Sequence, residues 1–373
     1  MRVKLTNICT PKQWKTIPTS ELLEKGYPVY GANGIIGYYS EYNHENTVVA
    51  ITCRGATCGA INITEPRAYV TGNAMCLDNV RADVLQEYLY YCLLHYDFNN
   101  VISGSAQPQI TRQGLEKVEI ELCPVEEQQK VIEVLRNTKA IIDGRKRELQ
   151  KLDELIKARF VEMFGDPITN LKGYTKLTVA EAIEAGFIEK PFDGNHGSKH
   201  PKSSEYVDAG IPFLMANNVI DGTVDQTNCS FITEERANRL DKGFARDNDV
   251  LITHKGTIGR TAVLRTDYNF VMLTPQVAAY RIIKGITPDY LCGYFATEFF
   301  QNEMKILAAA GGSTRAYAGI TAQLQLHIII PPLDEQYIYT DFIKHLDKSK
   351  VAVQKALDEA QLLFDSLMQK YFG

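Results

Sequence analysis

The chain of 373 residues repeats four short phrases in the same order, and this repeat constrains its fold more than any other feature. The first phrase is YPVYGANGIIGYY at residues 27–39, whose proline, alanine and asparagine recur 184 positions later in GIPFLMANNVIDG as Pro212, Ala216 and Asn217. The other three pairs are ITCRGATCGA (51–60) with ITHKGTIGRTA (252–262), SGSAQPQIT (103–111) with GGSTRAYAGIT (311–321), and PVEEQ (124–128) with PLDEQ (332–336). Four phrases in one order predict a tandem duplication with a unit of roughly 165 to 205 residues.

The first part of each copy combines β-like runs with short helical segments, and glycine-rich turns separate them. The expected strands lie at 47–52, 249–253 and 327–332. The expected helices lie at 87–96 and 289–304. This mixture predicts one compact α/β domain in each copy.

The second part of each copy has the pattern of one long helix, about 38 residues or roughly 57 Å. Pro124 and Pro332 precede the two helices, and Gly165 is placed to end the first. Apolar residues recur in heptad steps, which predicts a coiled-coil seam. The seam residues are Val131, Leu135, Ile142, Leu149, Leu152 and Ile156 in the first helix, and Phe342, Leu346, Val353, Leu357, Phe364 and Leu367 in the second. We expect the two helices to pack against each other; the alternative is that each seam packs on its own α/β domain.

The predicted fold is therefore mixed α/β, with two tandem globular domains joined by two long antiparallel coiled-coil helices in a pseudo-two-fold arrangement. The expected segments are a first domain at 1–124, a first helix at 125–165, a second domain at 166–332 and a second helix at 333–373.

Composition limits the function classes. The net charge is −5, which argues against a purely electrostatic nucleic-acid binder. No run of 18 apolar residues and no secretory signal occurs, so we expect a cytoplasmic protein with no membrane association. The eight cysteines lack the spacing of a zinc site, and we expect reduced, buried thiols.

Several motifs together resemble the specificity subunit of type I restriction-modification systems. The most specific is ARFVEMFGDPITN (158–170), followed by SGSAQPQITRQGL (103–115) and the two Pro-x-(Glu/Asp)-Glu-Gln helix starts. The resemblance covers essentially all of the chain. It implies two target recognition domains that each read one half of a bipartite double-stranded DNA target. It also implies that the coiled coil sets the spacer and docks two modification subunits, which carry S-adenosylmethionine and the methylation chemistry. Restriction subunits complete the nuclease.

The residues themselves offer no sign of catalysis. The Asn/Asp-Pro-Pro-aromatic phrase of adenine methyltransferases and the Walker A loop do not occur in the sequence. His196 and His200 have an i, i+4 spacing, but Gly197 and Pro201 place them in a loop, so we expect no metal. We therefore expect no catalytic residue and no cofactor in this chain. A silent specificity cassette and a coiled-coil scaffold that binds no DNA remain the alternatives.

Loops at matching places in the two copies supply the candidate DNA-contacting residues, since Arg and Lys read guanine, Asn and Gln read adenine, and Ser or Thr read either. The first-copy candidates are Asn33, Arg54, Thr57, Ser105, Gln107, Gln109 and Arg112. The second-copy candidates are Asn217, Asn218, Lys255, Thr257, Ser313, Arg315, Tyr317 and Gln323.

Residues shared by both copies, such as the Arg54/Lys255 and Asn33/Asn217 pairs, favour a structural or phosphate-binding role, because two half-sites usually differ. Residues that differ between the copies favour sequence reading. These are Gln107, Gln109, Arg112, Arg315 and Tyr317.

Overall fold

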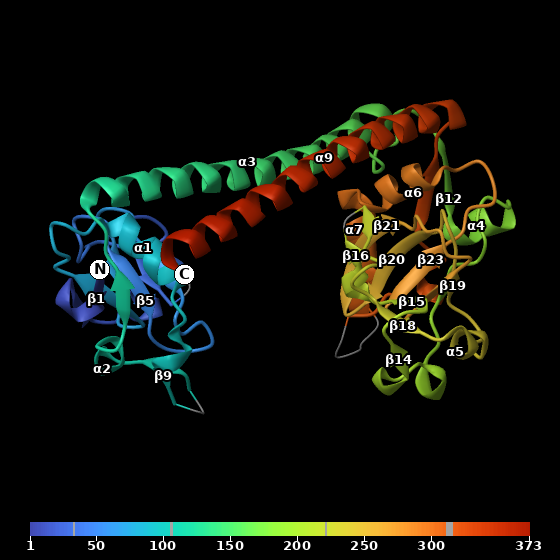
Figure 1. The fold of residues 1–373 in the computed structure, drawn as a ribbon. Coiled ribbons are helices and arrows are strands. Elements are labelled where there is room, and N and C mark those ends of the chain that lie inside the picture. The colour runs from blue at the N-terminus through green and yellow to red at the C-terminus, as the bar shows by residue number, and fades with distance from the viewer. Residues whose placement is uncertain (33, 105–106, 221, 311–315) are drawn as a thin grey trace. The chain divides into compact units, whose positions relative to one another are not determined.

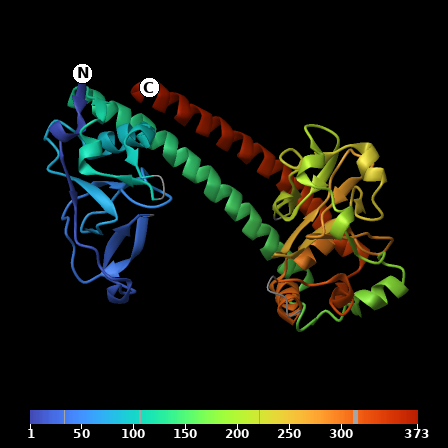
Figure 2. The ribbon, with the colours of Figure 1, turned by 90° about the horizontal axis from the view of Figure 1, so that it is seen from below.

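The computed structural model describes residues 1–32, 34–104, 107–220, 222–310 and 316–373. Contacts in space divide the chain into two compact units, residues 1–147 with 354–373 and residues 148–353 (Figure 1). Helix α3 (Val125–Phe164) and helix α9 (Leu333–Phe372) each contribute one end to each unit. Both termini therefore belong to the first unit (Figure 2).

The first unit is built on a four-stranded antiparallel sheet in the order β2 (Thr10–Gln13), β8 (Ala74–Asp78), β5 (Val49–Thr52) and β6 (Ile61–Ile63). A second sheet has the order β4 (Gly34–Tyr39), β3 (Tyr27–Gly31) and β7 (Tyr69–Val70). Two further strand pairs are β1 (Arg2–Lys4) with β11 (Glu119–Glu121), and β9 (Ile102–Ser103) with β10 (Gln109–Ile110). The short helices are α1 (Gln86–His95) and α2 (Arg112–Leu115).

The second unit repeats this plan. Its four-stranded sheet has the order β13 (Phe192–Asp193), β23 (Val277–Tyr280), β20 (Val250–Lys255) and β21 (Thr257–Val263). The second sheet is extended to β14 (Tyr206–Val207), β18 (Ser230–Ile232), β15 (Ile211–Leu214), β22 (Val271–Leu273) and β19 (Phe244–Ala245). The remaining strand pairs are β12 (Thr175–Thr178) with β24 (His327–Ile330), and β16 (Val219–Ile220) with β17 (Thr223–Val224). Its helices are α4 (Val179–Glu184), α5 (Glu234–Asn238), α6 (Pro288–Phe295), α7 (Glu298–Ala310) and α8 (Ile320–Gln323).

Equivalent hydrogen bonds join equivalent strands in the two units. The strand with the first repeated phrase runs parallel to a short strand in each unit, β3 beside β7 and β15 beside β22. A threonine N–H then donates to a carbonyl near the C-terminal end of that strand, Thr71 to Tyr30 and Thr274 to Leu214, at 3.0 Å in both units. The tandem duplication and the mixed α/β fold predicted from the sequence are thus present in the structure.

The 289–304 segment, predicted as one helix, is two helices. The Thr297 hydroxyl donates to the Tyr294 carbonyl at 2.6 Å and accepts from the Phe300 N–H at 3.4 Å. One side chain therefore closes α6 and begins α7. Apolar periodicity continues across this break and hides it from a sequence pattern.

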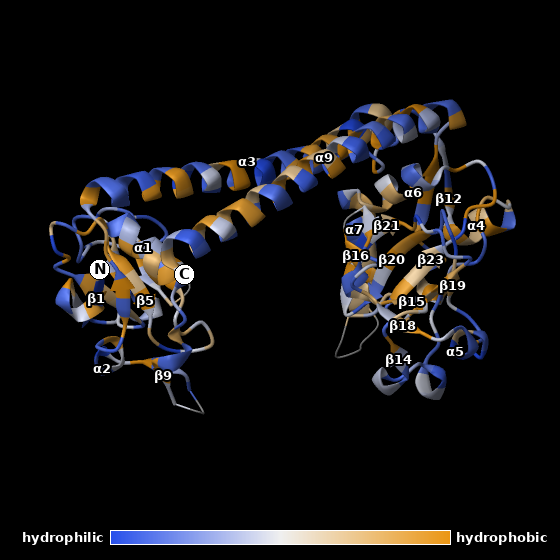
Figure 3. Cartoon of the chain, in the orientation of Figure 1, coloured by the Kyte–Doolittle hydropathy of each residue, from blue (hydrophilic) through white to orange (hydrophobic). Residues whose placement is uncertain are grey.

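Each unit has its own apolar core, and the strands of the central sheets supply much of it (Figure 3). The ends of the long helices complete both cores with aromatic residues. Phe164, the last residue of α3, packs edge-on against Tyr290 with ring centroids 4.8 Å apart. Phe372, the last residue of α9, packs on Tyr88 at 5.5 Å in the same way. The MFG phrase that ends α3 is thus matched by YFG at the end of α9.

Within each unit, α3 and α9 pack together. In the first unit, the predicted seam residues Val131, Leu135 and Ile142 are buried. In the second unit Val353 is buried, and the Lys350 ammonium lies 2.5 Å from the Asp153 carboxylate across the two helices. The other seam residues are half-buried: Leu149, Leu152, Ile156, Phe342, Leu346, Leu357, Phe364 and Leu367.

A buried glutamine ties the start of each long helix to its own unit. Gln128, the last residue of PVEEQ, is fully buried one turn into α3. Its Oε1 accepts from the Leu85 N–H at 2.9 Å, just before α1. Its Nε2 donates to the carbonyls of Asp83 and Cys123, each at 2.8 Å.

Gln336, the last residue of PLDEQ, is equally buried and makes the same three bonds in the second unit. Its Oε1 accepts from the Thr287 N–H at 2.7 Å, and its Nε2 donates to the carbonyls of Gly285 (3.1 Å) and Pro331 (2.8 Å). The repeated helix-start phrase is therefore explained by an amide that must both accept and donate.

Replacing Gln128 with Ala should lower the free energy of unfolding by about 1–3 kcal/mol, because three backbone groups lose their partner. Urea denaturation followed by the fluorescence of Trp14, the single tryptophan of the chain and part of the first unit, measures this change. The neighbouring Gln129 is exposed, so Gln129→Ala is the matched control and should change stability by less than about 0.5 kcal/mol. Equal effects of the two substitutions would contradict the assigned role.

Candidate nucleic-acid interface

The loop that carries Arg54 pairs with the segment that carries Gln109 on the first unit. The residue after Arg54 donates from its N–H to the carbonyl before Gln109 at 3.3 Å. The residue after Gln109 donates to the carbonyl before Arg54 at 3.0 Å, and the two residues form an isolated antiparallel bridge. The two candidates are thus held side by side by the backbone, independently of their side chains.

Lys255 and Tyr317 are held in the same way on the second unit. The residue after Lys255 donates to the carbonyl before Tyr317, and the residue after Tyr317 donates to the carbonyl before Lys255, both at 2.9 Å. The Lys255 ammonium lies 5.6 Å from the centroid of the Tyr317 ring. The glycine after each cation, Gly55 or Gly256, has a φ of 91° or 78°, a conformation that side chains with a Cβ rarely adopt.

This pairing corrects one sequence alignment. The repeated phrases SGSAQPQIT and GGSTRAYAGIT both end in Ile-Thr, which aligns Ile110 with Ile320 by sequence. In the structure Ile110 instead occupies the place of Ala318, since each follows the residue that bridges to the cation. Tyr317 is therefore the counterpart of Gln109, and the short helices α2 and α8 each begin three residues after these positions, at Arg112 and Ile320.

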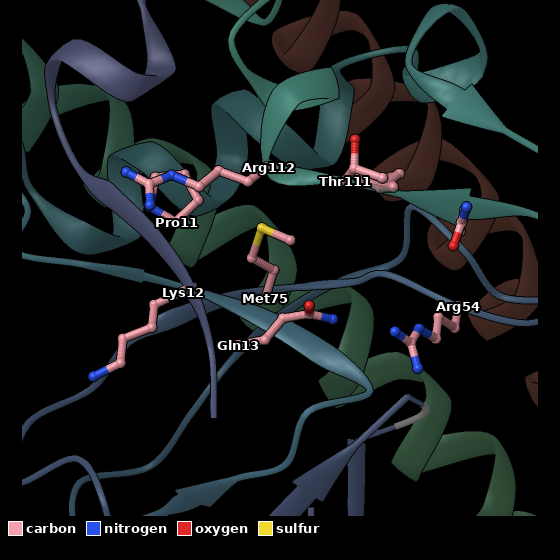
Figure 4. Close-up of a pocket in the computed structure, with 9 residues that line it drawn as sticks. Pro11, Lys12, Gln13, Arg54, Met75, Thr111 and Arg112 are labelled. Atoms are coloured by element: carbon pink, nitrogen blue, oxygen red, sulfur yellow. The ribbon is translucent and has the colours of Figure 1, made fainter. Parts of the chain in front are cut away.

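A cleft of about 280 Å³ lies beside Arg54 and Gln109 (Figure 4). Its lining combines three cations, two amide side chains, a hydroxyl and a small apolar floor. The lining residues are Pro11, Lys12, Gln13, Arg54, Met75, Gln109, Ile110, Thr111 and Arg112.

The three cations of the cleft, Lys12, Arg54 and Arg112, are exposed, and none of them forms an ion pair with another described residue. The Lys12 ammonium lies 3.5 Å from the centroid of the Trp14 ring. A cleft with three cations and no carboxylate partner is suited to an anionic ligand, and its amides can address hydrogen-bonding edges.

Lys12 and Gln13 were not among the residues selected from the sequence. They end β2, about 40 residues before Arg54, and no repeated phrase marks them, because the corresponding residues of the second unit are Phe192 and Asp193.

The remaining candidates fall into three groups. Thr57, Gln107, Asn217 and Thr257 have exposed side chains, as a contact residue requires. Asn33, Ser105, Ser313 and Arg315 lie outside the described residues.

The third group, Asn218 and Gln323, is buried, so the structure removes both from the set of surface contacts. The Asn218 Oδ1 accepts from the Met215 N–H at 2.9 Å and supports a tight turn. The Gln323 Oε1 accepts from the Tyr280 hydroxyl at 2.8 Å, and its Nε2 donates to the Ala318 carbonyl at 2.6 Å. A polar residue type in a promising loop could not reveal this burial.

One group of possible metal ligands occurs among the described residues. His44, Cys76 and Asp78 bring their ligand atoms within 4.8 Å of one another. His44 Nε2 and the Asp78 carboxylate are 3.0 Å apart, and the Trp14 N–H donates to the other carboxylate oxygen at 3.2 Å. Two of the three groups thus already have protein partners, and the network is accounted for as a hydrogen-bonded support of the β2–β8 edge.

No disulfide bond joins any of the eight cysteines, all of which lie in the described part of the chain, and burial raises the pKa of Cys9 to about 12. Each described helix is too short or too polar to cross a lipid bilayer.

A sequence model of the type I restriction modification DNA specificity domain matches residues 1–154 and 192–360. The specificity subunit of the type I restriction enzyme MjaVIII from Methanocaldococcus jannaschii is 23% identical over 72% of this chain and 67% of its own length. The specificity subunit of the type I restriction enzyme EcoBI from Escherichia coli is 22% identical over 94% of this chain and 75% of its own length. The crystal structure of an S subunit of a type I restriction-modification system from M. genitalium has a TM-score of 0.63 at 13% identity, covering 100% of this chain and 96% of that one.

Replacing Gln323 with Leu should destabilise the chain by about 1–3 kcal/mol, because the buried Tyr280 hydroxyl loses its acceptor. The additional substitution Tyr280→Phe removes the donor as well and should recover part of the loss. Urea denaturation followed by circular dichroism compares the two variants. A Gln323→Leu variant as stable as the parent chain would refute the structural role.

Proposed function

The chain belongs to the family of type I restriction-modification DNA specificity subunits, and we propose that it selects a bipartite sequence in double-stranded DNA, one half with each unit. The observation that supports this most directly is the repeated backbone bridge. It presents Arg54 beside Gln109 on one unit and Lys255 beside Tyr317 on the other. Two equivalent surfaces in one chain are suited to two half-sites, as the two subunits of dimeric DNA readers are.

The two positions of each bridge are suited to different contacts with DNA. A cation occurs at the first position of both, which suits phosphate or guanine recognition in either half-site. The second position is an amide in one unit and a phenol in the other, so the two units would read different bases. Gln109 can pair with adenine, and the Tyr317 hydroxyl offers one donor and one acceptor.

Catalysis is assigned to partner subunits. In this proposal two modification subunits bring S-adenosylmethionine and methylate the selected DNA, and restriction subunits cleave unmodified DNA. The relatives' names support an assembly, since they describe specificity subunits of type I restriction enzymes. The long helices would dock the modification subunits and set the spacing between half-sites.

The decisive experiment is a map of N6-methyladenine across the genome of cells with a matching modification subunit, with and without this chain. A new motif of two short half-sites around a fixed gap supports the proposal. A stable complex without new methylation would indicate a silent cassette. If the chain forms no complex with the modification subunit and produces no new methylation, the result favours a coiled-coil scaffold that binds no DNA.

Replacing Gln109 with Ala should relax one base position in one half of the methylated motif and leave the other half unchanged, because a bidentate amide contact contributes about 1–3 kcal/mol of discrimination. Tyr317→Ala is the matched variant on the other unit and should affect only the other half. The same methylation map measures both. An unchanged motif in the Gln109→Ala strain would remove this residue from the reading surface.

Deleting one heptad from each long helix should shorten the gap between the half-sites. Seven helical residues span about 10.5 Å, which is about three base pairs. Whole heptads keep the seam in phase. The methylated motif reports the gap directly, and a gap of the original length would refute the spacing role of the helices.

A further inference from the structure

The two units differ in what lies beneath their bridges. In the first unit, Gln13 pairs with Met75, and in the second unit Asp193 pairs with Ala278, at the same register of the four-stranded sheets. The residue before the cation is Cys53 in one unit and His254 in the other. The neutral pair Gln13 and Cys53, with Nε2 to Sγ at 2.9 Å, is thus replaced by the titratable pair Asp193 and His254.

Asp193 is a buried carboxylate with three cationic or potentially cationic neighbours. Its side chain is 4% exposed, and one oxygen lies 2.8 Å from His196 Nε2. The other oxygen is paired with the Lys242 ammonium. His254 Nε2 approaches the first oxygen to 3.8 Å, an ion-pair distance that is too long for a direct hydrogen bond. A carboxylate buried in this way requires such partners.

His254 is fully buried between this carboxylate and the candidate reading residues. Its Nδ1 lies 3.0 Å from the Ala318 carbonyl, whereas Nε2 is buried with no hydrogen-bond partner among the described residues. Its ring lies 5.5 Å from the Tyr317 ring, and Lys255 is the next residue along β20. A buried polar atom without a partner, directed toward a carboxylate, indicates a group that can accept a proton when its surroundings change.

We propose that Asp193 and His254 are positioning residues of the second recognition surface, and that reading of the second half-site is coupled to proton uptake by His254, while reading of the first is not. This inference rests on the proposed function. Protonation would give Nε2 a proton to donate to Asp193 and would fix the ring beneath Tyr317. The first unit has no equivalent, since Gln13 does not titrate and Cys53 is a thiol whose pKa burial raises.

The direction of the pH effect follows from the groups that face His254. Burial is the main cause that lowers its pKa, and the charges of His196 and Lys255 lower it further, while the Ala318 carbonyl and Asp193 raise it. Free His254 is therefore neutral near pH 7. A matched half-site that seats a phosphate at Lys255 offsets the repulsion from that ammonium, and a scrambled half-site does not seat it there. The matched site therefore raises the pKa of His254, and by linkage a lower pH strengthens binding to the matched site more than to the scrambled one. The effect should appear below the ordinary histidine range of about pH 6.5.

Because the two units are copies of one fold, the residue pair of one unit can be introduced into the other to test this proposal. The double variant Asp193→Gln with His254→Cys gives the second unit the pair of the first, which is compatible with the same backbone bridge. The complex with modification subunits is titrated with a fluorescent duplex carrying the mapped motif, and with duplexes in which one half-site is scrambled. The readout is the ratio of dissociation constants, scrambled over intact, at pH 7.5 and 5.5.

For the parent chain, discrimination at the second half-site should rise about three- to tenfold as the pH falls, and that at the first should stay constant. The double variant should lose this rise. His196→Gln is the control, because it removes the exposed imidazole on the same carboxylate and should retain the rise. If the double variant is less stable in thermal unfolding, His254→Asn replaces it, since its amide can still donate to the Ala318 carbonyl.

Discrimination at the second half-site that is independent of pH, or that stays pH-dependent without His254, overturns the inference while leaving the proposed function intact. Loss of discrimination at both half-sites in the parent chain would instead overturn the proposed function, and this inference with it.

Discussion

The buried amides of Gln128 and Gln336 are the interactions on which the arrangement of each unit depends. Each joins three backbone groups that would otherwise lie unpaired where a long helix leaves its domain. Glutamate cannot replace either glutamine, because an ionised carboxylate only accepts hydrogen bonds. Asparagine has the same amide, but its side chain is one methylene shorter. With the amide in place, the direction in which the helix leaves is fixed relative to α1 or α6. The aromatic ends of α3 and α9 then add to a core whose position is already determined.

Much of this fold could be predicted from the sequence, because repeated phrases mark places where the backbone has special requirements. PVEEQ and PLDEQ mark the amide, and the cation–glycine phrases mark a turn with positive φ. What escaped prediction depends on individual side-chain contacts that a sequence pattern does not show. The division of α6 from α7 rests on one threonine hydroxyl, and the burial of Asn218 and Gln323 depends on what packs over them. Lys12 and Gln13 line the cleft although their strand lies far from Arg54 in the sequence. Their counterparts in the second unit, Phe192 and Asp193, are different residue types, so no repeated phrase marks the position.

The bridge between the cation loop and its partner segment separates structure from specificity. Its bonds use only backbone N–H and carbonyl groups, so the side chains at the second position are free to differ, as Gln109 and Tyr317 do. The same freedom extends beneath the surface, where Gln13 and Cys53 exchange for Asp193 and His254 without altering the strand register. A duplicated scaffold of this kind can change what each half reads while its hydrogen-bonded framework stays the same.

The acidic balance of the chain is compatible with DNA recognition because charge acts locally. Exposed charges are screened beyond roughly 10 Å at ordinary ionic strength, so a net charge of −5 matters little to a phosphate held within a cleft. What matters there is that Lys12, Arg54 and Arg112 have no carboxylate partner among the described residues, so a phosphate need not displace one. Acidic surface elsewhere lowers the affinity for DNA of arbitrary sequence, which depends on phosphate contacts alone. A protein that must choose one sequence among many therefore gains discrimination from a surface that is cationic only where it reads.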